Sequence, residues 1–147
     1  MEKDVIISIK GVQRYENADP DTMELVTAGR LEREGNSYTL SYQESELTGL
    51  EGTLTTFQIE PERITLMRVG EFNSQMVFQE GRRHMSMYNT PYGAMTIGVN
   101  TRHLLAELDD QGGEIEIDYA IEIDHTVAGE NLFRINVREQ KRPAIKQ

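Results

Sequence analysis

The sequence predicts a single all-β domain that closes into an antiparallel barrel of about 8–11 strands. Three observations predict this fold class. Residues 115–124 alternate strictly between two faces, short apolar runs recur along the chain between turn-forming residues, and no segment has the spacing of an amphipathic helix. A sheet with one apolar face must cover that face, and closure into a barrel also removes exposed edges. A β-sandwich is the alternative architecture.

The N-terminal half contains six apolar runs with a period of two, which is the repeat of a β-strand. Turn-forming residues separate them, among them Glu34–Ser37 and the proline-containing Glu60–Glu62. Residues 45–53 form the least regular connection, with room for a helical turn. The expected strands of this half cover residues 5–10, 23–32, 38–43, 55–59, 64–69 and 76–78.

The C-terminal half ends in a long expected hairpin. Ile115, Ile117 and Tyr119 share one face of its first strand, and acidic residues occupy much of the other. Its second strand places Arg134 and Arg138 on the corresponding outer face, where opposite charges across an antiparallel pair contribute roughly 0.2–1 kcal/mol each. The expected strands of this half cover residues 85–87, 95–99, 104–108, 115–124 and 133–138.

The chain organisation is simple. A length of 147 residues corresponds to one domain, and no Gly/Ser-rich or Pro-rich linker divides it. We expect the barrel to occupy residues 1–139. Residues 140–147 change character to a basic, proline-containing stretch, which predicts a flexible tail.

Composition excludes several classes of function. The chain contains no cysteine, so a disulfide framework, a thiol nucleophile and a zinc ribbon are excluded. Its net charge of -10 argues against a nucleic-acid partner, since that affinity comes mainly from Lys and Arg. No run approaches the ~20 apolar residues of a membrane-spanning helix, and the N-terminus lacks a signal-peptide core. We therefore expect a cytoplasmic protein with no membrane partner.

Three residues form the candidate binding site. Tyr42 and Glu44 follow Tyr38 and Leu40 on one face of a strand, and Arg68 follows Ile64 and Leu66 in the same way, so all three are expected to point inward. Because a lone buried charge costs several kcal/mol, Glu44 and Arg68 either pair with each other, lie in water at the barrel mouth, or bind a ligand. A planar guanidinium suits a carboxylate or phosphate.

Four methionines give a second indication of a binding interior. Met76, Met85, Met87 and Met95 fall in successive expected strands, on what the alternation predicts to be their apolar faces. Flexible thioethers fill irregular cores, which is the more common role, and they also line adaptable ligand sites.

No motif predicts an enzyme, a metal or a cofactor. The three histidines, His84, His103 and His125, lack the local spacing of zinc ligands. The chain has no G-x-S-x-G motif, no G-x-G-x-x-G motif and no P-loop. The sequence therefore predicts a protein without catalytic residues, metal ligands or a resident cofactor.

Several short segments together resemble a known family. Residues 41–45 (SYQES), 48–53 (TGLEGT), 68–70 (RVG), 90–93 (TPYG) and 113–119 occur in an order and spacing similar to the YwiB-like family of uncharacterised bacterial proteins. The resemblance covers nearly the whole chain except the basic tail. It implies a calycin-like β-barrel, related in shape to lipocalins and fatty-acid-binding proteins. It implies no activity and no catalytic residues, because the family is a domain of unknown function.

Two functional hypotheses follow. The first is a barrel that binds a small, partly apolar ligand with an acidic or phosphate head group in its interior, through Tyr42, Glu44 and Arg68. The second is a solid barrel that acts as a protein-interaction or self-association module, for example as a homodimer, since a barrel of about eight strands can be filled by its own side chains.

Overall fold

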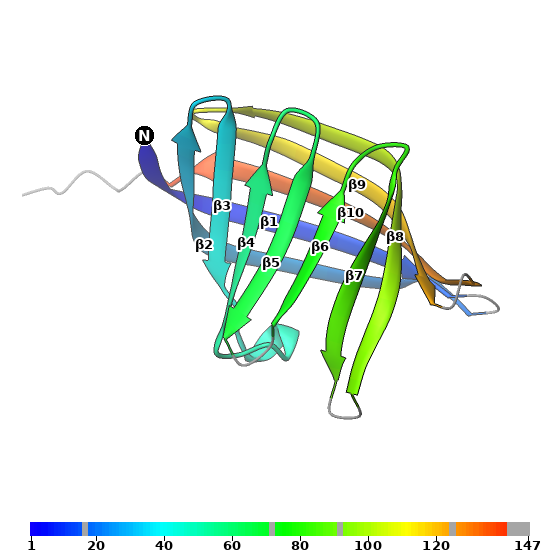
Figure 1. Ribbon diagram of the computed structural model, residues 1–147. Helices are drawn as coiled ribbons and strands as arrows, with labels where there is room; N and C mark the ends of the chain where they lie inside the picture. The colour runs from blue at the N-terminus through cyan, green and yellow to red at the C-terminus, as the bar shows by residue number, and fades with distance from the viewer. Residues whose placement is uncertain (16–17, 71–72, 91–92, 124–125, 141–147) are drawn as a thin grey trace, which may run out of the picture.

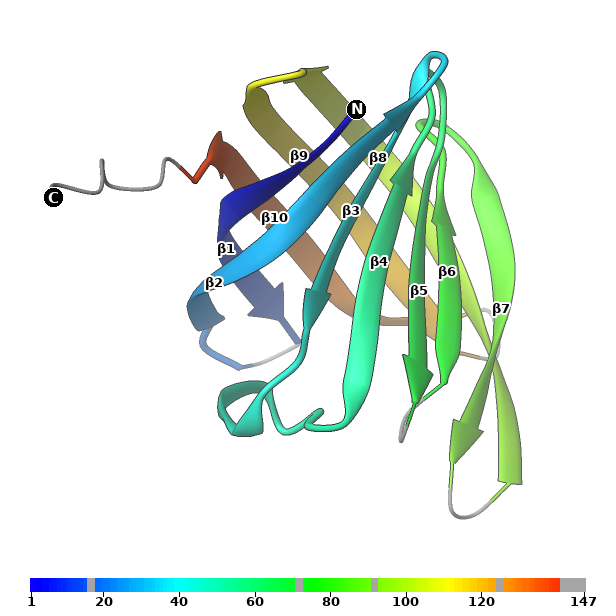
Figure 2. The same cartoon turned by 90° about the vertical axis from the view of Figure 1, so that its left-hand side faces the viewer.

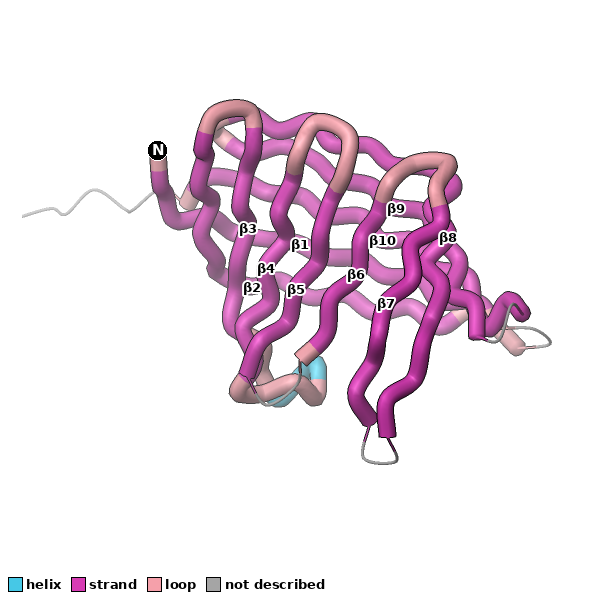
Figure 3. The backbone as a smooth tube through the Cα atoms, viewed as in Figure 1, coloured by secondary structure: helices cyan, strands magenta, loops and turns pink. Residues whose placement is uncertain are grey.

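The computed structural model describes residues 1–15, 18–70, 73–90, 93–123 and 126–140, and nearly all of them lie in β-strands (Figures 1 and 3). Among these residues, one short 3-10 turn, η1 (Glu46–Thr48), occupies the connection in which the sequence left room for a helical turn. The ten strands are β1 (Glu2–Arg14), β2 (Asp21–Glu34), β3 (Ser37–Gln43), β4 (Thr53–Ile59), β5 (Ile64–Gly70), β6 (Ser74–Phe78), β7 (Arg83–Thr90), β8 (Gly93–Asp109), β9 (Gly112–Ile123) and β10 (Thr126–Glu139).

All ten strands belong to one antiparallel sheet, in the order β6-β5-β4-β3-β2-β1-β10-β9-β8-β7. The sheet curls so that its two end strands, β6 and β7, lie next to each other, and Figure 2 shows the nearly closed barrel that results. Within the described chain, no strand ladder joins β6 to β7; instead the turn between them bonds to β8 through Gly81 and Thr101. The expected all-β, calycin-like barrel is confirmed.

The core fills the interior of the barrel. In β9, Ile115, Ile117 and Tyr119 are buried, as the alternation predicted, and Ile135 and Val137 of β10 pack beside them. Full burial of such a side chain contributes roughly 1.5–3 kcal/mol. The largest fully buried apolar side chains come from strands all around the barrel: Phe78, Ile7, Leu31, Leu40, Ile64, Ile115, Ile117, Ile135, Val5 and Val99.

The two ends of the barrel differ. At one end, tight turns join β2 to β3, β4 to β5 and β8 to β9 (Figure 1). There the Tyr38 hydroxyl donates a hydrogen bond to Asp110 at 3.0 Å, and Arg33 forms an ion pair with the same carboxylate at 3.1 Å. These contacts tie β2 and β3 to the turn between β8 and β9. At the opposite end, η1 lies in the connection from β3 to β4, and this end is called the mouth below.

The hairpin of β9 and β10 forms as expected, with Arg134 opposite Glu116 in the register and the two charges 3.7 Å apart. The predicted break at Asn100 is wrong, because β8 continues through it as one long strand. A register shift between Thr101 and His103 absorbs the irregularity that the sequence pattern marks at this point.

The predicted inward direction of Met85 is also wrong, because Met85 is 57% exposed, whereas Met76 is buried as expected. Met95 has the same strand parity as the buried Ile97, but it is exposed near the start of β8. The pairing of β7 with β8 decides which side chains of β7 point inward. It places Ser86 opposite the buried Ile97, so Met85, the residue before it, points outward. The side chain of the fourth methionine, at position 87, lies outside the described residues.

Strand β10 ends at Glu139, and positions 141–147 of the predicted tail lie outside the described residues. Among the residues that the structure describes, no helix is long and apolar enough to cross a membrane.

Neighbouring atoms lie so close to Gly29 of β2 that a larger residue at this position should lower the stability of the protein. A Cβ there would lie 2.5 Å from the backbone oxygen of Ser41 and would collide with the Ile7 side chain. We expect Gly29→Ala to lower the free energy of unfolding by about 1–3 kcal/mol, measured by urea denaturation. In the matched control Gly129→Ala, the new Cβ meets the exposed Tyr15 ring at 3.3 Å and the Arg14 carbonyl at an ordinary 3.7 Å, so a loss as large as that of Gly29→Ala would contradict this account.

Candidate functional site

A cavity of about 390 Å³ opens at the mouth of the barrel. It is lined by residues of β1, β2, β3, β5, β6, β9 and β10 and of the η1 turn. This volume is within the range of about 300–1,000 Å³ that small-molecule sites occupy. Most of the wall is apolar, and its members are Met23, Leu25, Leu47, Leu50, Leu66, Met76, Tyr119, Ile121 and Phe133.

All three residues predicted from the sequence line this cavity. The sheet register explains how two of them meet: Tyr42 of β3 lies opposite Thr55 of β4, which lies opposite Arg68 of β5. The three side chains therefore form one row across the inner face of the sheet. Glu44 follows directly after β3, and its backbone N–H donates to the Thr53 carbonyl at 2.9 Å, which continues the pairing with β4.

Two threonine hydroxyls hold the Glu44 carboxylate. Thr55 donates to Oε1 and Thr48 of η1 donates to Oε2, each at 2.7 Å, and the Glu44 residue is only 7% exposed. The turn that carries Thr48 is itself capped by Ser45, whose side chain accepts a hydrogen bond from the Leu47 backbone N–H. The carboxylate thus connects the barrel wall to the turn at the mouth.

Tyr42 shares the electrostatic environment of Glu44 and Arg68. Burial raises the pKa of the Tyr42 hydroxyl above its usual value, and the negative charge of Glu44 raises it further. The positive charge of Arg68 acts in the opposite direction. The phenol therefore stays neutral around neutral pH and keeps its proton as a hydrogen-bond donor.

Two polar side chains at the cavity lack a hydrogen-bond partner among the described residues, Arg68 at its Nε and Asn131 at its amide. The Nε of Arg68 is buried without a hydrogen bond, and Arg68 forms no ion pair with any described acidic residue. Asn131 of β10 is only 7% exposed, and its amide makes no hydrogen bond to another described side chain or backbone group. A buried polar group without a partner is costly, so both are positioned to bind something that enters the cavity.

The sequence interpretation missed Thr48, Thr55 and Asn131 as parts of the site. A signal for two of them was present in the alternation. Thr55 has the same parity as the buried Phe57, and Asn131 has the same parity as Phe133. A polar residue at an inward position of a strand is the feature that identifies both.

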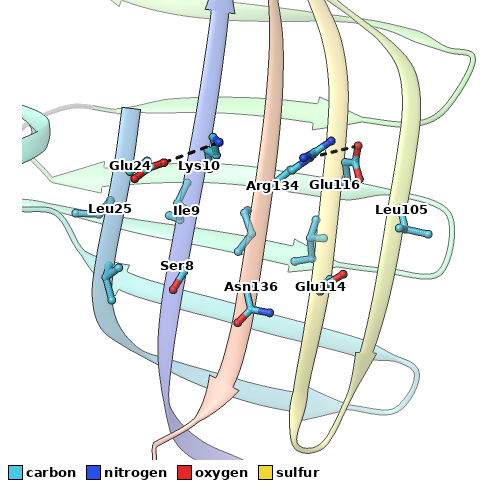
Figure 4. A pocket seen from close by; sticks show the side chains of 13 residues that line it. Ser8, Ile9, Lys10, Glu24, Leu25, Leu105, Glu114, Glu116, Arg134 and Asn136 are labelled. Atoms are coloured by element: carbon cyan, nitrogen blue, oxygen red, sulfur yellow. Dashed lines mark ion pairs between the residues drawn. The ribbon is translucent and has the colours of Figure 1, made fainter. Parts of the chain in front are cut away.

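A second hollow, of about 540 Å³, lies on the outer face of the sheet across β2, β1, β10, β9 and β8 (Figure 4). Four of its five charged side chains pair between neighbouring strands, Lys10 with Glu24 at 3.9 Å and Arg134 with Glu116 at 3.7 Å, and the fifth is Glu114. Because both basic side chains are exposed and already paired, the outer hollow offers an anionic ligand less than Arg68 does at the mouth.

Two buried threonines provide a matched test of the carboxylate contacts. Thr55→Val removes one of the two donors to the buried Glu44, and we expect the free energy of unfolding to fall by about 1–3 kcal/mol in urea denaturation. Thr101 is equally buried, but its hydroxyl has no partner, so Thr101→Val should change stability by less than about 0.5 kcal/mol or raise it. Equal losses in the two variants would refute the role given to Thr55.

Comparison with known proteins gives a family and a fold. The chain is similar to the crystal structure of ywiB protein from Bacillus subtilis, with a TM-score of 0.83 and 20% sequence identity over 95% of this chain and 94% of that chain. At this identity the likeness shows the fold alone. A search of curated proteins finds no match. The model of a family described as a domain of unknown function, DUF1934, matches residues 7–135, and the chain therefore belongs to the DUF1934 family.

Proposed function

We propose that this protein is a cytoplasmic β-barrel that binds a small, partly apolar ligand in the cavity at its mouth. The ligand's acidic or phosphate head group lies against Arg68, with Asn131 as a further hydrogen-bond donor and the Tyr42 phenol, which hydrogen-bonds to Glu44, beside it. Its apolar part lies on Leu66 and Phe133 farther along the cavity wall. The absence of cysteine fits a reducing compartment.

One observation carries the proposal: Arg68 lines a cavity of ligand size, and its buried Nε has no hydrogen-bond partner. A guanidinium forms strong, charge-assisted hydrogen bonds with carboxylates and phosphates. An Arg that served only the fold would be expected to have its own carboxylate partner, and the nearby Glu44 carboxylate instead accepts from two threonines. The cavity also favours a binding role over the alternative of a solid interaction barrel.

The probe for this proposal is anilinonaphthalene sulfonate, which combines a single negative charge with an apolar aromatic body. We expect one molecule to bind per chain, with a rise in its fluorescence. Arg68→Met should weaken its binding by about tenfold or more, because the charge-assisted hydrogen bonds are lost.

The matched control is Arg134→Met, which removes an exposed arginine from the outer face. It should leave binding of the dye unchanged. Failure of the dye to bind the folded wild-type protein, or equal binding by the wild type and Arg68→Met, would contradict the proposal. Circular dichroism of each variant would show that the fold is retained.

A further inference from the structure

The cavity at the mouth contains charges of both signs that do not neutralise each other directly. Its charged lining consists of Asp21 and Glu44, which are acidic, and Arg68, which is basic. No ion pair joins Arg68 to either acid within the described chain. The lining therefore carries one net negative charge and offers separate positions for an anion and for a cation.

Glu44 retains the capacity to bind a cation. Each of its carboxylate oxygens accepts one threonine hydroxyl, and the Tyr42 hydroxyl is a third partner of the carboxylate. An ionised carboxylate has about four lone-pair sites, so one position remains for a further donor. The Thr48 hydroxyl also lies 3.1 Å from the Ser45 carbonyl, so its single proton can serve either acceptor. The anionic charge of Glu44 is thus hydrogen-bonded by neutral hydroxyls and is not balanced by a contacting cation.

Arg68 and Asn131 provide the complementary position for an anion. The Arg68 Nε is buried without a partner, and the Asn131 amide can donate from the opposite side, since β5 and β10 are far apart in the order of the sheet. A ligand that brought only negative charge would satisfy these donors, but it would also add to the net negative charge of the lining. A dianion would be opposed more strongly than a monoanion.

From this arrangement we infer that the ligand is a zwitterionic amphiphile. It carries an anionic group for Arg68 and Asn131 and, a few bonds away, a cationic group for Glu44. This inference rests on the proposed function and narrows its ligand class. An α-amino acid with a long apolar side chain has this chemistry.

The apolar wall suits the remainder of such a ligand. Tyr119 and Phe133 line the cavity with ring centroids 5.8 Å apart, and Tyr119 also contacts the fully buried Phe78 with centroids 4.7 Å apart. Leu66 and Met76 complete this side. This apolar wall can contact the apolar part of a ligand whose charged head lies at Arg68 and Glu44.

The experiment compares three probes with the same apolar chain by isothermal titration calorimetry at neutral pH: α-aminodecanoate, decanoate and decylamine. They differ only in the charged groups at one end. We expect α-aminodecanoate to bind about tenfold tighter than either of the others, because each charge-assisted contact contributes about one order of magnitude.

Two variants assign the charges. In Glu44→Gln, the advantage of α-aminodecanoate over decanoate should disappear, while its advantage over decylamine remains. In Arg68→Met, the advantage of α-aminodecanoate over decylamine should disappear, while its advantage over decanoate remains. If either variant fails to fold, the relative affinities of the wild-type protein for the three probes still test the inference.

The outcomes separate this inference from the proposed function. Decanoate that binds as tightly as α-aminodecanoate, and loses affinity in Arg68→Met, would overturn the zwitterion and retain the anion-binding barrel. Decylamine as the tightest probe would overturn both. A wild-type chain that binds none of the three would also count against both.

Discussion

The hydrogen bonds from Thr48 and Thr55 to the Glu44 carboxylate are the interaction on which the rest of the site depends. They satisfy a buried acid with neutral donors at 2.7 Å each, so that acid does not require a contacting arginine. Arg68, one strand beyond Thr55, has a buried Nε that finds no acceptor in the described part of the chain. The same contacts join η1 to the barrel wall and so define one side of the cavity at the mouth.

The barrel explains why this unusual arrangement occurs at one end only. Toward the tight turns, large side chains such as Phe78, Leu40 and Ile64 fill the interior, and Tyr38 and Arg33 fasten the end to Asp110. Toward the mouth, the inner positions of β3, β5 and β10 change from apolar to polar residues. Apolar side chains at these inner positions would stabilise the fold more than polar ones do, so the polar residues there indicate a function.

Much of the fold could be predicted from the sequence because period-two alternation is a local signal. Residues 115–123 show it clearly, and the same parity argument brought Tyr42, Glu44 and Arg68 to one interior. The two errors, the direction of Met85 and the break at Asn100, have a common cause. Which face a strand residue points to depends on how the strand pairs with its neighbour, and the sequence of one strand does not show this pairing. Met85 lies outside because Ser86 faces the same side as Ile97 across the ladder, and the register shift after Thr101 keeps β8 continuous. Contacts between distant segments, such as Glu44 with Thr55, depend on register and have no local signature.

The central claim is that Arg68 serves a ligand and not the fold. The most direct measurement is the free energy of unfolding of Arg68→Met in the ligand-free protein, compared with the wild type by urea denaturation. Since this guanidinium forms no ion pair with the acidic residues that the structure describes, the account predicts a change of less than about 1 kcal/mol or an increase in stability. A loss of about 3–5 kcal/mol, the cost of breaking a buried ion pair, would show that Arg68 is a structural residue and would contradict the account.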